Sequence, residues 1–165
     1  MKHIAEQVGA KGLSSLLAAV EDVNVGRKHR VLELAKLQLG NLEGKRVAVL
    51  GAAFKPNTDD IRDSPAIDIA QRFHDAGASV VVQDEMAIES VVRELPHFDA
   101  VVSTEDAFSQ ADLVVIATEW RSYAQINPDA AGALVKQKNL ILARKVVDEK
   151  LWQSHGWNVK ALGRS

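Results

Sequence analysis

Five charged or aromatic side chains lie close together in one short stretch of the sequence, residues 54–62. They are Phe54, Lys55, Asp59, Asp60 and Arg62. A phenyl ring can pack against a planar base, a lysine ammonium can bind a phosphate or hydroxyl group, and an arginine can bind a second phosphate or a carboxylate. In a loop, however, such residues more often form a solvated surface with a few weak ion pairs. The residue types alone therefore leave both interpretations open and favour the solvated surface.

The elements around this stretch give more weight to ligand binding. Residues 46–50 form a short apolar run that ends at Gly51, which is typical of a buried parallel strand. Similar runs at 79–83 and 112–118 alternate with helical patterns, and this alternation predicts a doubly wound α/β fold with a parallel sheet. Ligands of such folds bind beyond the carboxyl ends of the strands. Ligand binding and solvated surface thus become equally good interpretations of the 51–63 loop.

The remaining elements follow from hydrophobic periodicity and capping residues. The expected helices are 65–76, 87–95, 105–110, 129–136 and 148–155. Two further strands are expected at 139–143 and 157–161. A long helix from about Ser14 to Leu39 should precede the sheet, because apolar residues recur there at helical spacing before Gly40. A small domain cannot cover such a helix on every side, so we expect it to pack on a partner.

Composition and charge exclude several classes of function. The 165 residues suffice for one domain with a sizeable core and some appended structure. A formal net charge of −2 gives no broad attraction to nucleic acid or to an anionic membrane, and no apolar run approaches the ~20 residues that span a bilayer. There is no cysteine, and the histidines lack metal-ligand spacing, so we expect no thiol nucleophile and no metal site. Residues 1–7 show no signal-peptide pattern, which makes a cytoplasmic location the default.

Two features distinguish the loop from a dinucleotide site. No glycine follows Gly51 at the spacing of the dinucleotide fingerprint, so a pyrophosphate cradled on a helix N-terminus is not expected. Asp84 follows the second strand, where NAD-binding folds place a ribose-binding acid; without the glycine-rich turn, we interpret it as a cap or turn residue. Trp120 follows the 112–118 strand, at an edge where ligands of such folds bind, and a packing role is at least as good an interpretation of it as a role in a ligand site.

The stretch from Gly51 to Ala66, GAAFKPNTDDIRDSPA, closely resembles the signature of the UDP-glucose/GDP-mannose dehydrogenase family at the start of its UDP-binding domain. Residues 16–24, 112–120 and 156–164 resemble further segments of the family in the same order, so the similarity covers nearly the whole chain. It implies that residues 1–42 are the end of a central helical dimerisation domain. Residues 43–165 would then form a Rossmann-like UDP-sugar-binding domain.

The resemblance also implies roles for individual residues. By matching positions, Phe54 and Lys55 would contact the UDP-sugar, and Arg62 would reach across a domain cleft to NAD. The family's Asp-Gly-Arg-Asn stretch corresponds to Leu-Ala-Arg-Lys at 142–145, in which Arg144 is retained as a third substrate-binding residue. The other three positions differ, and alanine in place of glycine no longer allows easy positive φ. That side of the pocket is therefore expected to be rearranged or to bind more weakly.

Members of the family oxidise a sugar 6-hydroxyl to a carboxylate in two NAD-dependent steps, as from UDP-glucose to UDP-glucuronate, through an intermediate on a cysteine. Since this chain has no cysteine, the resemblance implies a fragment or truncated product that binds a UDP-sugar, supplies no catalytic residue and is inactive alone. NAD would be bound mainly by a domain outside the chain, and the N-terminal helix would form a homodimer. The alternative is a non-enzymatic, dimerising nucleotide-binding module from a truncated reading frame. The sequence leaves open which nucleotide sugar is bound.

Overall fold

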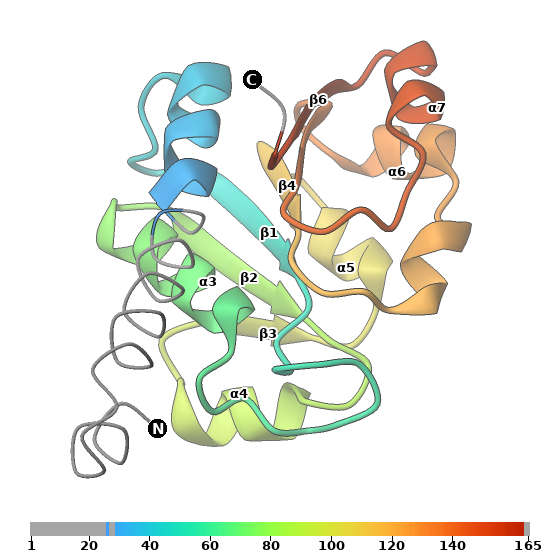
Figure 1. Ribbon diagram of the computed structural model, residues 1–165. Coiled ribbons are helices and arrows are strands. Elements are labelled where there is room, and N and C mark those ends of the chain that lie inside the picture. The colour runs from blue at the N-terminus through green and yellow to red at the C-terminus, as the bar shows by residue number, and fades with distance from the viewer. Residues whose placement is uncertain (1–25, 27–28, 164–165) are drawn as a thin grey trace, which may run out of the picture.

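In the described part of the chain, a parallel sheet of six strands forms the centre of the fold (Figure 1). The computed structural model describes residue 26 and residues 29–163. The strand order across the sheet is β3-β2-β1-β4-β5-β6. The strands are β1 (Arg46–Leu50), β2 (Ser79–Gln83), β3 (Asp99–Val101), β4 (Leu113–Ile116), β5 (Asn139–Leu142) and β6 (Asn158–Ala161). The doubly wound α/β fold that the sequence predicted is confirmed.

Helices cover both faces of this sheet (Figure 1). They are α3 (Pro65–Asp75), α4 (Ile88–Glu94), α5 (Thr104–Phe108), the 3₁₀ helix η1 (Arg121–Gln125), α6 (Pro128–Leu134) and α7 (Glu149–Ser154). Apolar residues of α3 and α4 bury against one face, and those of α5, η1, α6 and α7 bury against the other. Residues 29–39 are also helical, and Val31, Leu34 and Ala35 belong to the core on the α3 side.

The sequence of β1 shows why the strands are buried on both sides. Val47 and Val49 point into the core on the α3 side, whereas Ala48 and Leu50 point into the core on the α5 side. This alternation follows from the two-residue period of a strand, and covering both faces requires apolar side chains at successive positions. The helix that follows the 51–63 loop also begins as its sequence predicts. Ser64 is the N-cap of α3 and accepts a hydrogen bond from the Ala66 amide at 3.2 Å.

Two elements were not predicted, and each lacks the pattern that would have indicated it. The strand β3 has only three residues and pairs with β2 alone, at the edge of the sheet, so it needs no continuous apolar run. The 3₁₀ helix η1 buries only Tyr123 among its five residues and therefore shows no helical periodicity. The predicted helix from Ser14 to Leu39 lies mostly outside the described residues, as does most of the predicted 1–42 domain. The boundary at residue 42 stays a prediction.

Candidate functional site

The residues singled out from the sequence lie at the carboxyl-terminal edge of the sheet. The direction in which the strands are added reverses between β1 and β4, and loops that leave such a switch point commonly bind ligands. The 51–63 loop leaves β1, and the 143–148 segment leaves β5, which neighbours β4. The amides of Ala143 and Arg144 both donate to the Ile116 carbonyl, at 3.0 and 3.1 Å. The backbone of Arg144 is thereby fixed at the end of β4.

Hydrogen bonds hold the first part of the 51–63 loop on the sheet. The Gly51 amide donates to the Gln83 carbonyl at 2.6 Å. The Ala52 and Ala53 amides both donate to the Asp84 carboxylate, at 2.7 and 3.1 Å. The Phe54 amide then donates to the Asp60 carbonyl at 2.8 Å, which closes the rest of the loop. The backbone just before Lys55 is therefore tied both to β2 and to the far side of the loop.

Phe54 and Lys55 point outward from this anchored backbone. The Phe54 side chain is 55% exposed, although a phenylalanine is normally buried in a protein of this size. Lys55 is exposed as well, and no hydrogen bond or ion pair joins its ammonium to another residue in the described part of the chain. The exposed ring can pack on a base, and the unpaired cation beside it can bind a phosphate. Arg144 is exposed as well, and no hydrogen bond or ion pair joins its guanidinium to another described residue.

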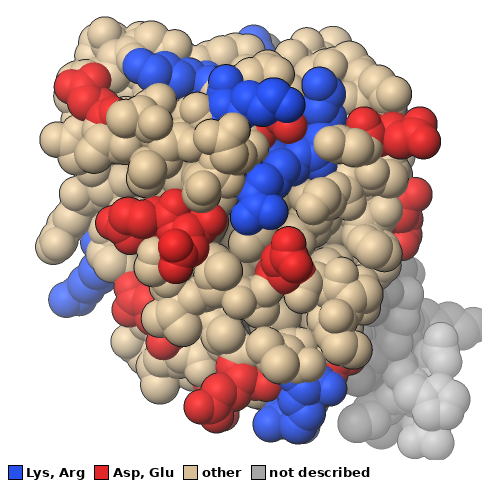
Figure 2. Space-filling view, turned by 180° about the vertical axis from the view of Figure 1, so that it is seen from behind, with Lys and Arg blue, Asp and Glu red and all other residues tan. Residues whose placement is uncertain are grey.

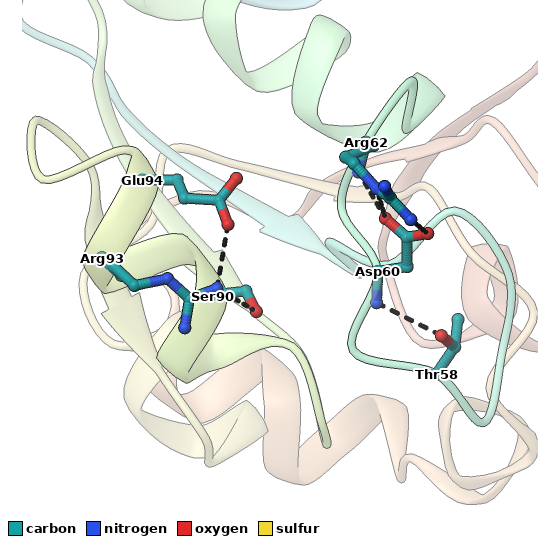
Figure 3. A network of polar contacts seen from close by, with 6 residues as sticks. All are labelled: Thr58, Asp60, Arg62, Ser90, Arg93 and Glu94. Atoms are coloured by element: carbon teal, nitrogen blue, oxygen red, sulfur yellow. Dashed lines mark hydrogen bonds and ion pairs between the residues drawn. The ribbon is translucent and has the colours of Figure 1, made fainter.

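Arg62, in contrast, is already paired. Figure 3 shows its guanidinium against the Asp60 carboxylate, with Nε 2.9 Å from Oδ1 and Nη2 2.7 Å from Oδ2. Hydrogen bonds from the Arg62 side chain and then from its backbone amide lower the pKa of Asp60 to about 2. The pair in turn raises the pKa of Arg62 above its ordinary value, with Glu94 of α4 adding to the attraction. Since the Arg62 side chain is 82% exposed, this pair is weak and can be exchanged for a ligand anion.

No room remains for a side chain on Gly51, at the end of β1. Gly51 has φ +105°, and a Cβ atom built there would lie 2.1 Å from the Thr118 hydroxyl oxygen. Thr118 follows β4, so the chain after β4 passes against the chain after β1. The loop after β1 also lacks the further glycines that let a pyrophosphate approach the backbone in dinucleotide folds.

Asp84 also departs from the dinucleotide pattern, as expected. Its side chain is fully buried, and its Oδ1 accepts from the amides of Met86 and Ala87 at 2.9 and 3.0 Å. A turn role is therefore confirmed, and a carboxylate held in this way is not available to a ribose. Trp120 is buried and donates from Nε1 to Asp84 Oδ2 at 3.2 Å, so its packing role is confirmed. The additional bonds from Asp84 to the loop after β1 were not predicted.

Other parts of the described chain contain less that points to chemistry. A groove of about 290 Å³ lies between α5, η1 and α6, with Phe108 and Leu134 among its apolar lining, but none of the predicted site residues lines it. Within residues 26 and 29–163, no three histidine, aspartate or glutamate side chains gather as a metal site would require, and no helix is long and apolar enough to cross a membrane. Figure 2 shows basic side chains gathered in a band across the upper part of one face, with acidic side chains beside and below them.

A family model for the UDP binding domain of the UDP-glucose/GDP-mannose dehydrogenase family matches residues 48–149. The chain belongs to this family. The matched range begins within β1 and includes β2 to β5 and all four predicted site residues, so the resemblance seen in the 51–66 stretch is confirmed. The family's UDP binding domain thus coincides with the part of the chain that forms the edge described above.

Relatives of known name agree with this assignment. The UDP-glucose 6-dehydrogenase AglM of Haloferax volcanii is 41% identical over 135 residues, which are 82% of this chain and 31% of that protein. The structure of a UDP-glucose dehydrogenase from Pyrobaculum islandicum superposes with a TM-score of 0.77 at 30% identity, over 96% of this chain and 33% of that one. The structure of an NDP-N-acetyl-D-galactosaminuronic acid dehydrogenase from Methanosarcina mazei Go1 superposes with a TM-score of 0.73 at 25% identity, over 85% of this chain and 29% of that one. The chain therefore spans about a third of the length of the family members that it matches.

Proposed function

We propose that this chain forms the UDP-sugar-binding part of an NAD-dependent UDP-sugar 6-dehydrogenase, with UDP-glucose as the substrate. Phe54 packs on the nucleotide sugar, Lys55 binds it through its ammonium, and Arg144 contacts it from the β5 side. The observation that supports this most is the anchored backbone at Ala52 and Ala53, which presents an exposed ring and an unpaired lysine side by side. Family membership supplies the class of ligand.

The same proposal assigns NAD to a different place. The loop after β1 lacks the glycines of a dinucleotide fingerprint, and Thr118 lies against Gly51 at its start. We therefore assign NAD mainly to a region outside this chain, with Arg62 as the residue that reaches toward it. The chemistry that NAD would supply there is that of a hydride acceptor, and the residues described here would bind and orient the sugar nucleotide. With no cysteine in its sequence, this chain alone is expected to give no NADH from UDP-glucose and NAD.

Calorimetric titration of the chain with UDP-glucose and with UDP tests the binding role. Wild-type protein should bind both, and Lys55→Ala should raise the Kd about tenfold, because a charge-assisted hydrogen bond to phosphate is lost. Lys36→Ala is the matched control, since Lys36 is an exposed lysine on the helix before β1. Its Kd should stay within about twofold of the wild-type value. No heat of binding at millimolar ligand, or equal losses in the two variants, would contradict the proposal.

Parallel titrations with UDP-N-acetylglucosamine and GDP-mannose address the choice of ligand. If UDP-glucose is the substrate, it should bind more tightly than either. Tighter binding of GDP-mannose would keep the family role and overturn the assignment of the sugar nucleotide.

Pairing of two copies through the N-terminal helix is the remaining part of the proposal. Leu37 is 72% exposed on the described end of that helix, which is unusual for a leucine. Sedimentation velocity should show a dimer for the wild type and a shift toward monomer for Leu37→Glu. Leu151→Glu, at an exposed leucine on α7, should leave the sedimentation unchanged. A monomeric wild type would contradict pairing.

A further inference from the structure

Three consecutive residues at the end of β2 bind three side chains of the segment that follows β4. The Tyr123 hydroxyl donates to Gln83 Oε1 at 2.7 Å, and Trp120 Nε1 donates to Asp84 Oδ2 at 3.2 Å. The Ser122 hydroxyl donates to the Glu85 carboxylate. We call these three hydrogen bonds the β2–η1 clamp. It joins residues that are 36 to 40 positions apart in the sequence.

The clamp crosses over the end of β1, because β1 lies between β2 and β4 in the sheet. Gly51 at the end of β1 lies against Thr118 so closely that no Cβ atom fits between them. No room for a ligand group therefore remains between Gly51 and Thr118. Under the proposed function the ligand binds the side chains that the 51–63 loop presents at the surface, and the course of that loop decides where they stand.

Asp84 connects the clamp to the loop. Besides Trp120, its Oδ2 accepts the amides of Ala52 and Ala53, while its Oδ1 accepts those of Met86 and Ala87. Five donors thus converge on one fully buried carboxylate. Hydrogen bonds to an ionised acceptor are about twice as strong as neutral ones, and buried networks of this kind hold their members rigidly. The two amides directly before Phe54 are therefore fixed by Asp84.

We propose that Asp84 is a positioning residue for nucleotide-sugar binding, acting through the backbone of Ala52 and Ala53 on Phe54 and Lys55. This inference rests on the proposed function, since Lys55 is taken as the ligand-binding cation. Asp84 does not touch the ligand, because it has no exposed surface. Its contribution is to keep the Lys55 ammonium near its bound position before the ligand arrives, which lowers the cost of ordering the loop on binding.

The test uses Asp84→Asn in the full 165-residue chain, because an asparagine keeps the shape and loses one acceptor oxygen. The new NH₂ group takes the place of either Oδ1, which accepts two hydrogen bonds, or Oδ2, which accepts three. Since NH₂ cannot accept them, the variant loses at least two hydrogen bonds. Asp112→Asn is the matched control. Asp112 is also buried, at 2% exposure, and accepts the Arg46 amide at 3.0 Å, but it precedes β4 at the opposite edge of the sheet. Thermal unfolding reports how much stability each variant loses.

Calorimetry should give a Kd for UDP-glucose about tenfold higher for Asp84→Asn, and within about twofold of wild type for Asp112→Asn. The double variant Asp84→Asn/Lys55→Ala decides whether Asp84 acts through Lys55. If it does, the losses are not additive, and the double variant binds little worse than Lys55→Ala. Additive losses, an unchanged Kd for Asp84→Asn, or equal losses in the two asparagine variants would each overturn the inference.

A measurement without ligand separates this inference from the proposed function. In wild-type protein the Ala52 and Ala53 amides should be protected from hydrogen exchange, and in Asp84→Asn their protection should fall at least about tenfold while the amides of β5 stay protected. Should wild-type protein bind no nucleotide sugar, the proposed function fails for this chain, and the exchange rates alone decide the role of Asp84 in holding the loop. Amides that exchange equally fast in wild type and variant would refute that role.

Discussion

The Asp60 carboxylate and the Arg62 guanidinium form a two-point ion pair within the 51–63 loop, with contacts of 2.9 and 2.7 Å (Figure 3). Lys55 of the same loop has no such partner in the described part of the chain. The loop therefore offers one unpaired cation and one that must first leave its own carboxylate. This difference is why we assign the two residues different roles and predict different behaviour for them.

The first prediction concerns the pKa of Asp60. The hydrogen bonds from Arg62 lower it to about 2, from an ordinary value of 3.8. Because the folded-state value is the lower one, the pair stabilises the fold above pH ~3.8, and this contribution is lost as the pH falls through ~2. A carboxyl NMR titration should find the low pKa in wild type and a higher pKa in Arg62→Gln, still below 3.8 because the backbone amide of residue 62 keeps its hydrogen bond to Asp60. Arg93→Gln, which removes an arginine paired with Glu94, should leave the pKa of Asp60 low.

The second prediction follows from the pairing of Arg62. Arg62→Ala removes a cation that is already paired with Asp60, so it should change the affinity of this chain for UDP-glucose by less than about twofold. Lys55→Ala should cost clearly more in the same titration. Equal losses, or a larger loss for Arg62→Ala, would show that Arg62 rather than Lys55 binds the nucleotide sugar.

The third prediction concerns Gly51. Gly51→Ala should lower the free energy of unfolding by about 3 kcal/mol, because the new methyl group meets Thr118 and the residue has positive φ. Gly156→Ala is the control for the backbone strain, since Gly156 has φ +83° with no atom within 4 Å of its Cβ position. That variant should lose only about 1 kcal/mol in chemical denaturation. Similar losses at the two positions would mean that Thr118 does not restrict Gly51.

The fourth prediction uses Tyr123, the single tyrosine of the sequence. Burial of its phenol, and then the negative charge of Asp84, raise the pKa of Tyr123 above its ordinary value of 10.0. The folded state holds this proton more tightly than the unfolded state does, so the contribution to stability is complete below pH ~10 and declines above it.

Phenolate absorbance is the readout, because no other tyrosine contributes to it. In native protein the signal should rise only together with unfolding, whereas in concentrated urea it should rise near pH ~10. Circular dichroism in the same samples reports unfolding. A phenolate signal near pH 10 in protein that is still folded would disprove the burial of this hydroxyl group.

Much of the fold follows from local sequence. The apolar runs of β1 and β4 predict strands buried on both faces, because successive side chains of a strand point to opposite sides. Ser64 and Pro65 predict the start of α3, since a hydroxyl can cap the first turn and proline needs no donor there. The strand β3 escaped prediction because an edge strand of three residues needs few apolar side chains.

The sequence by itself also indicated the candidate site, because loops after parallel strands gather at one edge and the 51–66 stretch resembles a family signature. It could not tell which of Asp59 and Asp60 pairs with Arg62, since both lie within reach and only the course of the loop selects one. It gave no sign that Asp84 binds Ala52, Ala53 and Trp120. Those partners lie 31 to 36 positions away. Only the strand order, with β1 between β2 and β4, brings them together, so the tertiary structure alone decided how the loop is held.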